Sequence, residues 1–135
     1  MKHLTITLLT LLVLGGCSNE GPQLVERGGL IYEVNSQTPF TGSAVSYYEN
    51  GQLEVSGNWK NGKQDGPLEG YHENGQLSFK GNWKDGKEDG PYESYYENGQ
   101  LESKGNLKDG KEEGLSENYD ENGIQYYKIH EENYD

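Results

Sequence analysis

The sequence has few of the side chains from which an ordinary globular core is built. Apolar residues make up 30% of its 135 residues, with two tryptophans, two phenylalanines and one methionine. So little apolar material cannot fill a thick core between two layers of secondary structure. The single cysteine excludes a disulfide within the chain. The fold must therefore be stabilised in another way.

Motifs typical of enzymes and metal proteins are equally scarce. The sequence has no Gly-x-Ser-x-Gly motif and no glycine-rich phosphate loop, and beyond the first residues its only histidines are His72 and His130. His72 occupies a position that Tyr48 and Tyr96 fill in related segments, which favours packing over general-base catalysis. No histidine has partners at metal-ligand spacing. We therefore expect a protein that is not an enzyme, with no catalytic residues, no metal and no cofactor.

Acidic residues, by contrast, are abundant, and the formal net charge at pH 7 is −12. This charge repels nucleic acid and anionic lipid headgroups, so it excludes nucleic-acid binding and favours a basic protein as partner. The segment 85–90 superficially resembles an EF-hand loop, but Lys87 stands where a calcium ligand is required. Weak surface binding of calcium remains an alternative to an ordinary solvated turn at four carboxylates, Glu88, Asp89, Glu112 and Glu113.

The N-terminal residues have the pattern of an export signal. A positive start at Met1-Lys2-His3 is followed by a short apolar stretch to Leu14, too short to span a bilayer. Leu14-Gly15-Gly16-Cys17 then resembles the bacterial lipobox, and the alternative is an ordinary signal peptide with a chance cysteine. The resemblance implies that Cys17 becomes the lipidated first residue of the mature protein, held on a membrane by acyl chains such as palmitate. Ser18 after the cysteine favours the outer membrane of a Gram-negative cell, or otherwise the cell membrane.

The most informative feature present is a 24-residue repeat. The segment Tyr47-Tyr48-Glu49-Asn50-Gly51-Gln52-Leu53 recurs with small changes from Tyr71 and from Tyr95, and a divergent fourth copy starts at Tyr119. A fixed period of this length predicts a repeat architecture in which each unit stacks on its neighbours. The chain is therefore expected to divide into a signal peptide at 1–16, a lipidated tether at 17–29, an atypical capping unit at 30–46, three repeats at 47–118, and a partial fourth repeat with an acidic tail at 119–135.

Turn dipeptides punctuate the repeats. Asn50-Gly51 predicts a two-residue type I′ hairpin turn, which requires positive φ at both residues and places Tyr48 opposite Leu53. Asn61-Gly62 marks the next turn, and the same alternation recurs in each copy. No segment has the 3.6-residue apolar rhythm of a helix. The sequence therefore predicts an all-β fold, a single elongated antiparallel meander sheet of stacked β-hairpins.

Period-two alternation sorts the strand side chains onto an apolar and a polar face. Glycines inside the strands, at Gly57, Gly81 and Gly105, would let neighbouring rings lie flat over the backbone. The expected apolar face carries Ala44, Tyr48, Leu53, Val55, Trp59, Leu68, His72, Leu77, Phe79, Trp83, Tyr92, Tyr96, Leu101 and Leu107. The expected polar face carries Glu54, Glu102 and a row of tyrosines, Tyr47, Tyr71, Tyr95 and Tyr119. This row is the candidate binding surface, unless its rings merely cover their own sheet.

Two recurring elements carry a family resemblance. Gly-Asn-Trp-Lys-x-Gly-Lys-x-x-Gly and Tyr-Tyr-Glu-Asn-Gly-Gln-Leu, over roughly 40–127, resemble the MORN family (membrane occupation and recognition nexus), in particular bacterial MORN-repeat-variant lipoproteins. The resemblance implies an elongated, curved sheet of hairpins and roles in scaffolding, lipid contact and protein interaction. It also implies an antitoxin-like grouping.

Two hypotheses about function follow. The first is a lipoprotein, anchored to the membrane through Cys17, that acts as a non-enzymatic interaction or scaffold module. The alternative is an antitoxin or immunity-like protein that neutralises a toxin by binding it directly, although the predicted export signal argues against a cytoplasmic toxin. An envelope hydrolase has no supporting constellation of residues.

Overall fold

The computed structural model describes residues 21–126, and the fold that these residues adopt is all-β. The predicted meander of successive antiparallel hairpins is confirmed. Within this range no helix is long and apolar enough to cross a membrane. The predicted signal peptide, Cys17 and the acidic tail from residue 127 onward lie outside the described residues.

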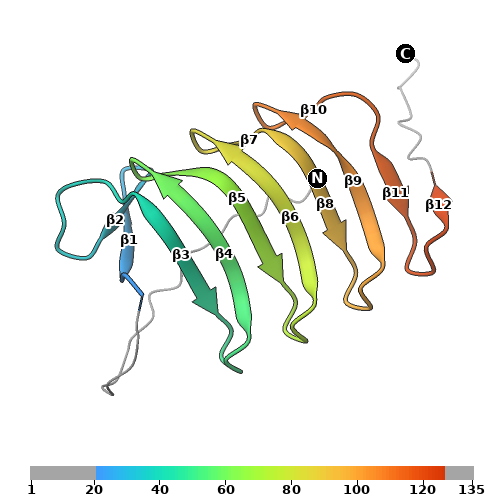
Figure 1. Ribbon diagram of the computed structural model, residues 1–135, viewed down its shortest axis with the longest axis horizontal. Helices are drawn as coiled ribbons and strands as arrows, with labels where there is room; N and C mark the ends of the chain where they lie inside the picture. The colour runs from blue at the N-terminus through green and yellow to red at the C-terminus, as the bar shows by residue number, and fades with distance from the viewer. Residues whose placement is uncertain (1–20, 127–135) are drawn as a thin grey trace, which may run out of the picture.

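Within residues 21–126, twelve strands form two sheets (Figure 1). The strands are β1 (Leu24–Arg27), β2 (Leu30–Glu33), β3 (Gly42–Tyr47), β4 (Leu53–Lys60), β5 (Lys63–Tyr71), β6 (Leu77–Lys84), β7 (Lys87–Glu88), β8 (Gly90–Tyr95), β9 (Leu101–Lys108), β10 (Lys111–Glu112), β11 (Glu117–Tyr119) and β12 (Gln125–Tyr126). A small β1–β2 sheet precedes a ten-stranded sheet in the order β12-β11-β9-β8-β6-β5-β4-β3, in which β7 pairs with β6 and β10 with β9. Figure 1 shows this sheet as one curved layer.

Turns of two kinds alternate along the sheet. At Asn61-Gly62 both residues have positive φ, 52° and 79°, as a type I′ turn requires, and Asp85-Gly86 and Asp109-Gly110 have the same geometry. At Asn50-Gly51 only the glycine has positive φ, 82°. A hydrogen bond of 2.9 Å from Gly51 N to Tyr48 O closes this turn. The type I′ prediction is therefore confirmed at the Asn61, Asp85 and Asp109 turns and wrong at the Asn50, Asn74, Asn98 and Asn122 turns.

The wider Asn-Gly turns change the strand register beside them. Ser46 opposes Val55, as a two-residue turn would require, but a bulge then places Tyr47 opposite Leu53. The same shift brings Tyr71 opposite Leu77 and Tyr95 opposite Leu101. The expected Tyr48–Leu53 pair is therefore wrong, whereas the register farther along the strands agrees with the prediction.

This bulge also moves side chains from one face to the other, because opposed residues on antiparallel strands share a face. Three leucines expected on the apolar face instead share the tyrosine face; they are Leu53, Leu77 and Leu101. Glu54 and Glu102 make the opposite change. Their carboxylates accept hydrogen bonds from Ser46 Oγ and Ser94 Oγ, each at 3.0 Å, on the face opposite the tyrosines.

The apolar face packs its side chains against the sheet itself. Among the described residues only two apolar side chains are buried, Leu68 at 2% and Phe40 at 7% exposed. A Cβ atom added at Gly57 would lie 2.3 Å from Leu68 Cδ1, and one added at Gly70 would lie 2.0 Å from Phe79 Cε1. These side chains therefore lie flat over glycine backbone, where any other residue would collide with them.

The same packing recurs in the later repeats. The Trp83 ring lies 3.0 Å from the Cβ position of Gly81, and the Tyr92 ring lies 2.8 Å from that of Gly105. The predicted role of Gly57, Gly81 and Gly105 is confirmed, while Gly70 was not predicted. A single layer can thus bury apolar surface without a second sheet. This explains how a chain with so few apolar residues can fold.

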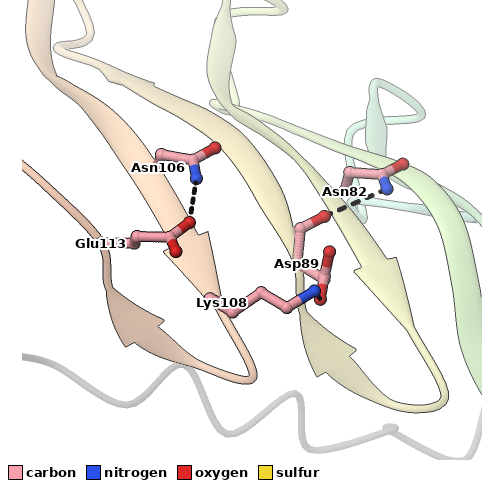
Figure 2. A network of polar contacts seen from close by, with 5 residues as sticks. All are labelled: Asn82, Asp89, Asn106, Lys108 and Glu113. Atoms are coloured by element: carbon pink, nitrogen blue, oxygen red, sulfur yellow. Dashed lines mark hydrogen bonds and ion pairs between the residues drawn. The ribbon is translucent and has the colours of Figure 1, made fainter.

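Two return strands are interrupted beside an asparagine, one between β7 and β8 and the other between β10 and β11, whereas β5 is continuous. Asp89 N donates to Asn82 O at 2.8 Å, and Asn82 Nδ2 donates to Asp89 O at 3.2 Å (Figure 2). In the next repeat Glu113 N donates to Asn106 O at 2.9 Å, and Asn106 Nδ2 donates to Glu113 Oε2 at 3.0 Å. Each interruption is therefore bridged by one backbone hydrogen bond and one from an asparagine side chain.

The N-terminal hairpin docks on the first type I′ turn. Ile31 N donates to Gly62 O at 2.9 Å, and Phe40 N donates to Ile31 O at 2.8 Å. Phe40 then packs against Trp59, with ring centroids 6.4 Å apart. Part of the segment 17–29, expected as a tether, is strand β1, and Gly28-Gly29 is its turn to β2.

Candidate functional site

The four tyrosines of the predicted row stand at equivalent strand ends across the sheet. Tyr47 ends β3, Tyr71 ends β5, Tyr95 ends β8 and Tyr119 ends β11. Tyr47 lies on the edge strand and is 60% exposed, and the other three are half-buried. We call the face that carries them the tyrosine face.

Three of these tyrosines are held by a glutamate two residues earlier on the same strand. Tyr71 Oη donates to Glu69 Oε2 at 2.7 Å. Tyr95 Oη donates to Glu93 Oε2, and Tyr119 Oη donates to Glu117 Oε2. Residues two apart on a strand share a face, so each hydrogen bond fixes the direction of a ring along its strand. These pairs were not predicted, although the Glu-x-Tyr spacing recurs in all three copies.

The glutamates belong to a row of alternating charge that crosses the sheet. Strand pairing places Glu69, Lys80, Glu93, Lys104 and Glu117 side by side in that order. Lys80 Nζ lies 2.9 Å from Glu93 Oε2, and Lys104 Nζ lies 3.2 Å from Glu117 Oε1. Both lysine side chains remain more than 40% exposed, so each pair contributes little to stability. We call this set the charged row.

Leucines lie between the tyrosines. Each is the strand partner of a tyrosine and so faces the same way, and each is half-buried. Read across the sheet from β3 to β11, the row is Tyr47, Leu53, Tyr71, Leu77, Tyr95, Leu101 and Tyr119. The tyrosine face therefore presents an aromatic and aliphatic strip beside a charged row.

A shallow depression adjoins the charged row. Its volume is about 310 Å³, at the lower end for a ligand site. Pro67 and Pro91 stand on two of its lining strands, with Asn82 on the strand between them. The rest of the lining is Leu68, Glu69, Lys80, Gly81, Tyr92 and Glu93. The depression therefore extends the strip toward the other end of the strands.

Separate ladders of side chains join one repeat to the next at the Asn-Gly turns. Tyr48 Oη donates to Tyr71 O at 2.6 Å, and His72 Nε2 lies 2.8 Å from Tyr95 O. Asn50 Nδ2 donates to Glu73 O at 3.1 Å, and the asparagines of the next two turns make the same contact. His72 thus makes the contact that tyrosine makes in the neighbouring copies. These contacts stack the repeats, which is a structural role.

The acidic residues considered for calcium do not gather into one site. Asp89 Oδ2 lies 2.6 Å from Lys108 Nζ, and Glu113 accepts the hydrogen bond from Asn106, as Figure 2 shows. Tyr92 Oη donates to Glu112 Oε1 at 3.4 Å. Between residues 21 and 126 no group of three or more His, Cys, Asp or Glu side chains could hold a metal ion. Asp89, Glu112 and Glu113 are instead partners of a lysine, a tyrosine and an asparagine of the protein.

Hydrogen bonds shift the pKa values of four members of the charged row, Lys80, Glu93, Lys104 and Glu117. The Tyr95 hydroxyl, and after it Lys80, hold the pKa of the Glu93 carboxyl below its usual value. Tyr119 and then Lys104 lower the pKa of Glu117 in the same way. The carboxylate of Glu93 in turn raises the pKa of Lys80. Each of these shifts favours the charged form of its group.

These shifts predict acid sensitivity. A carboxyl whose pKa is lower in the folded state stabilises that state above its unfolded pKa, near 4.5 for glutamate, and loses this contribution as the pH falls through the folded value. We expect the urea midpoint to be constant near neutrality and to fall below about pH 5. The double variant Glu93→Gln, Glu117→Gln should flatten that fall, because it removes both carboxyls whose pKa is lowered. An unchanged slope in the double variant would contradict this account.

Comparison with known protein families gives one result. Three segments, 40–61, 64–85 and 88–109, match the family model described as MORN repeat variant. The matched segments follow one another with the period found in the sequence, but the phase of the family model starts at Phe40 rather than at Tyr47. Each segment contains an Asn-Gly turn and the strand after it, and ends at the first residue of a type I′ turn. No curated protein matches the chain.

Proposed function

Because residues 40–109 contain three MORN repeat variants, we propose that the protein is a membrane-anchored, non-enzymatic scaffold that binds another protein through the tyrosine face. MORN repeats are typically modules for interaction with proteins or membranes. The lipid on Cys17 would hold the chain to the membrane, and the sheet would present its strip to the partner.

The observation that carries this proposal is the strip itself. Seven tyrosine and leucine side chains follow one another across the strands of a single layer, and Tyr47 at its start is 60% exposed. Aromatic side chains are enriched at the centres of protein interfaces. Repeat sheets offer extended surfaces of this kind. The net charge of −12 would steer a basic partner toward the surface and keep nucleic acid away.

The anchor is tested by removing the lipidation site. Cys17→Ser should leave the protein soluble after cell lysis, because the acyl chains supply nearly all of its membrane affinity. The measurement is fractionation after salt and carbonate washes, with Ser18→Ala as the matched control that stays in the membrane fraction. A Cys17→Ser protein that still fractionates with membranes would contradict the anchor. In Gram-negative cells the unsubstituted protein is expected in the outer membrane, and in other cells in the cell membrane.

The interaction is tested by crosslinking in intact membranes. The double variant Tyr71→Ala, Tyr95→Ala should lose the crosslinked partner while keeping the folded sheet. A partner that is itself toxic, and that the protein neutralises on binding, would favour the alternative antitoxin or immunity-like function. Unchanged crosslinking in the double variant would show that the tyrosines only cover their own sheet and do not bind the partner.

A further inference from the structure

On the strip of the tyrosine face, tyrosine rings form the ridges and leucine side chains form the floors between them. Tyrosine rings alternate with leucine side chains on successive strands, and hydrogen bonds to Glu69, Glu93 and Glu117 hold three of the rings. A fixed ring binds without losing much conformational entropy, since its rotamer is set before the ligand arrives. One leucine stands between each two neighbouring rings, and we call each such position a slot; its apolar side chain suits a compact apolar group of a ligand.

The spacing of the ridges selects the ligand conformation. Successive tyrosines stand two strands apart, which corresponds to about 9.5 Å. A polyproline II helix has three residues per turn and advances about 9.3 Å per turn. A β-strand repeats every two residues over about 6.8 Å, and an α-helix advances about 5.4 Å per turn. Of these three conformations only polyproline II presents one turn to each slot.

The charged row gives the strip a preference for cations. Glu69, Glu93 and Glu117 recur with the same two-strand period and lie beside the tyrosines to which they are bonded. One basic residue per polyproline II turn can therefore face one carboxylate per repeat. The intervening lysines are more than 40% exposed, so they can swing into solvent when a guanidinium takes their place.

We propose that the tyrosine face binds a basic, proline-rich segment in the polyproline II conformation, laid across the strands with prolines in the slots between the tyrosines. The proposal rests on the proposed function and names the partner's chemistry. Aromatic ridges that accept a preformed extended helix are a recurrent solution for peptide recognition, because the ligand has little entropy left to lose.

The test is titration of full-length protein in detergent with synthetic peptides. A peptide of Pro-Pro-Arg repeats should bind, and one of Gly-Gly-Arg repeats, with the same charge but no preference for polyproline II, should bind about tenfold or more weakly. Tyr71→Ala, Tyr95→Ala should weaken Pro-Pro-Arg binding by about tenfold or more. Tyr71→Phe, Tyr95→Phe keeps both rings and should retain most of the affinity, and thermal unfolding reports whether each variant is folded.

The controls separate the outcomes. Tyr126→Ala removes a 40% exposed tyrosine that pairs with Asn118, on the face opposite Tyr119, and should leave binding unchanged. Equal binding of both peptides would show that charge alone attracts them to the surface, which would overturn the proposal. So would no binding at all, or tyrosine-dependent binding of a neutral linear glycan in place of the peptide. If peptide binding fails while the tyrosine variants still lose the crosslinked partner, the proposed function stands and only this inference falls.

Discussion

Leu68→Ala is expected to destabilise the sheet by about 3–4 kcal/mol. Leu68 is 2% exposed, the largest fully buried side chain in the described part of the chain, and it lies over Gly57 on the neighbouring strand. A single-layer sheet has no second layer that could collapse into the cavity. The cost should therefore include a cavity contribution in addition to the lost transfer free energy of the leucine side chain.

The measurement for Leu68→Ala is equilibrium urea unfolding followed by tryptophan fluorescence. Leu115→Ala is the matched control, because Leu115 is 97% exposed and its truncation should change the free energy of unfolding by less than about 0.5 kcal/mol. Equal effects of the two variants would show that Leu68 is not part of a core.

Gly70→Ala is expected to cost about 2–3 kcal/mol, although alanine normally limits the unfolded chain and so favours folding. The added Cβ atom would lie 2.0 Å from Cε1 of Phe79 and 2.6 Å from its Cδ1, so the ring must leave the sheet surface. Gly21→Ala is the matched control, because nothing lies within 4 Å of its Cβ position. A thermal midpoint of Gly70→Ala equal to that of the control would contradict the packing described for the apolar face.

The sequence predicts the architecture of this protein well because every copy repeats the same signals. Turn dipeptides, alternation and internal glycines agree in each copy, and such agreement across levels specifies one fold. Strand β1 was missed although Gly28-Gly29 is a hairpin signal between apolar residues, because the glycines and charges of that segment suggested a tether.

The wrong assignments of side chains to the two faces of the sheet arise from one ambiguity in the Asn-Gly turns. An Asn-Gly pair suits a two-residue type I′ turn, and it suits equally a wider turn in which only the glycine has positive φ. The side chain of Asn50 reaches Glu73 O in the next repeat, a contact that no local sequence pattern reveals. The wider turn inserts a bulge, which moves Leu53 to the tyrosine face. A one-residue shift is sufficient for this, because side chains alternate between faces.

The candidate site was thus predicted in part. Alternation placed the tyrosines on the polar face, and the Glu69–Tyr71 hydrogen bond between same-face positions agrees with that placement. The leucines lie between the tyrosines only because of the bulge, which the sequence does not reveal. The charged row results from the pairing of neighbouring strands, and sequence spacing alone does not give that register. The order of charges across the sheet became evident only from the strand register.

The central claim is that side chains lying over glycines hold this single layer together, and a double-mutant cycle at Gly70 and Phe79 tests it most directly. The free energy of unfolding is measured for the unsubstituted protein, Gly70→Ala, Phe79→Ala and the double variant. Because Phe79→Ala removes the ring that the new methyl group strikes, Gly70→Ala should cost about 2–3 kcal/mol in the unsubstituted protein and close to nothing beside Phe79→Ala. An equal cost of Gly70→Ala in both backgrounds would contradict the account.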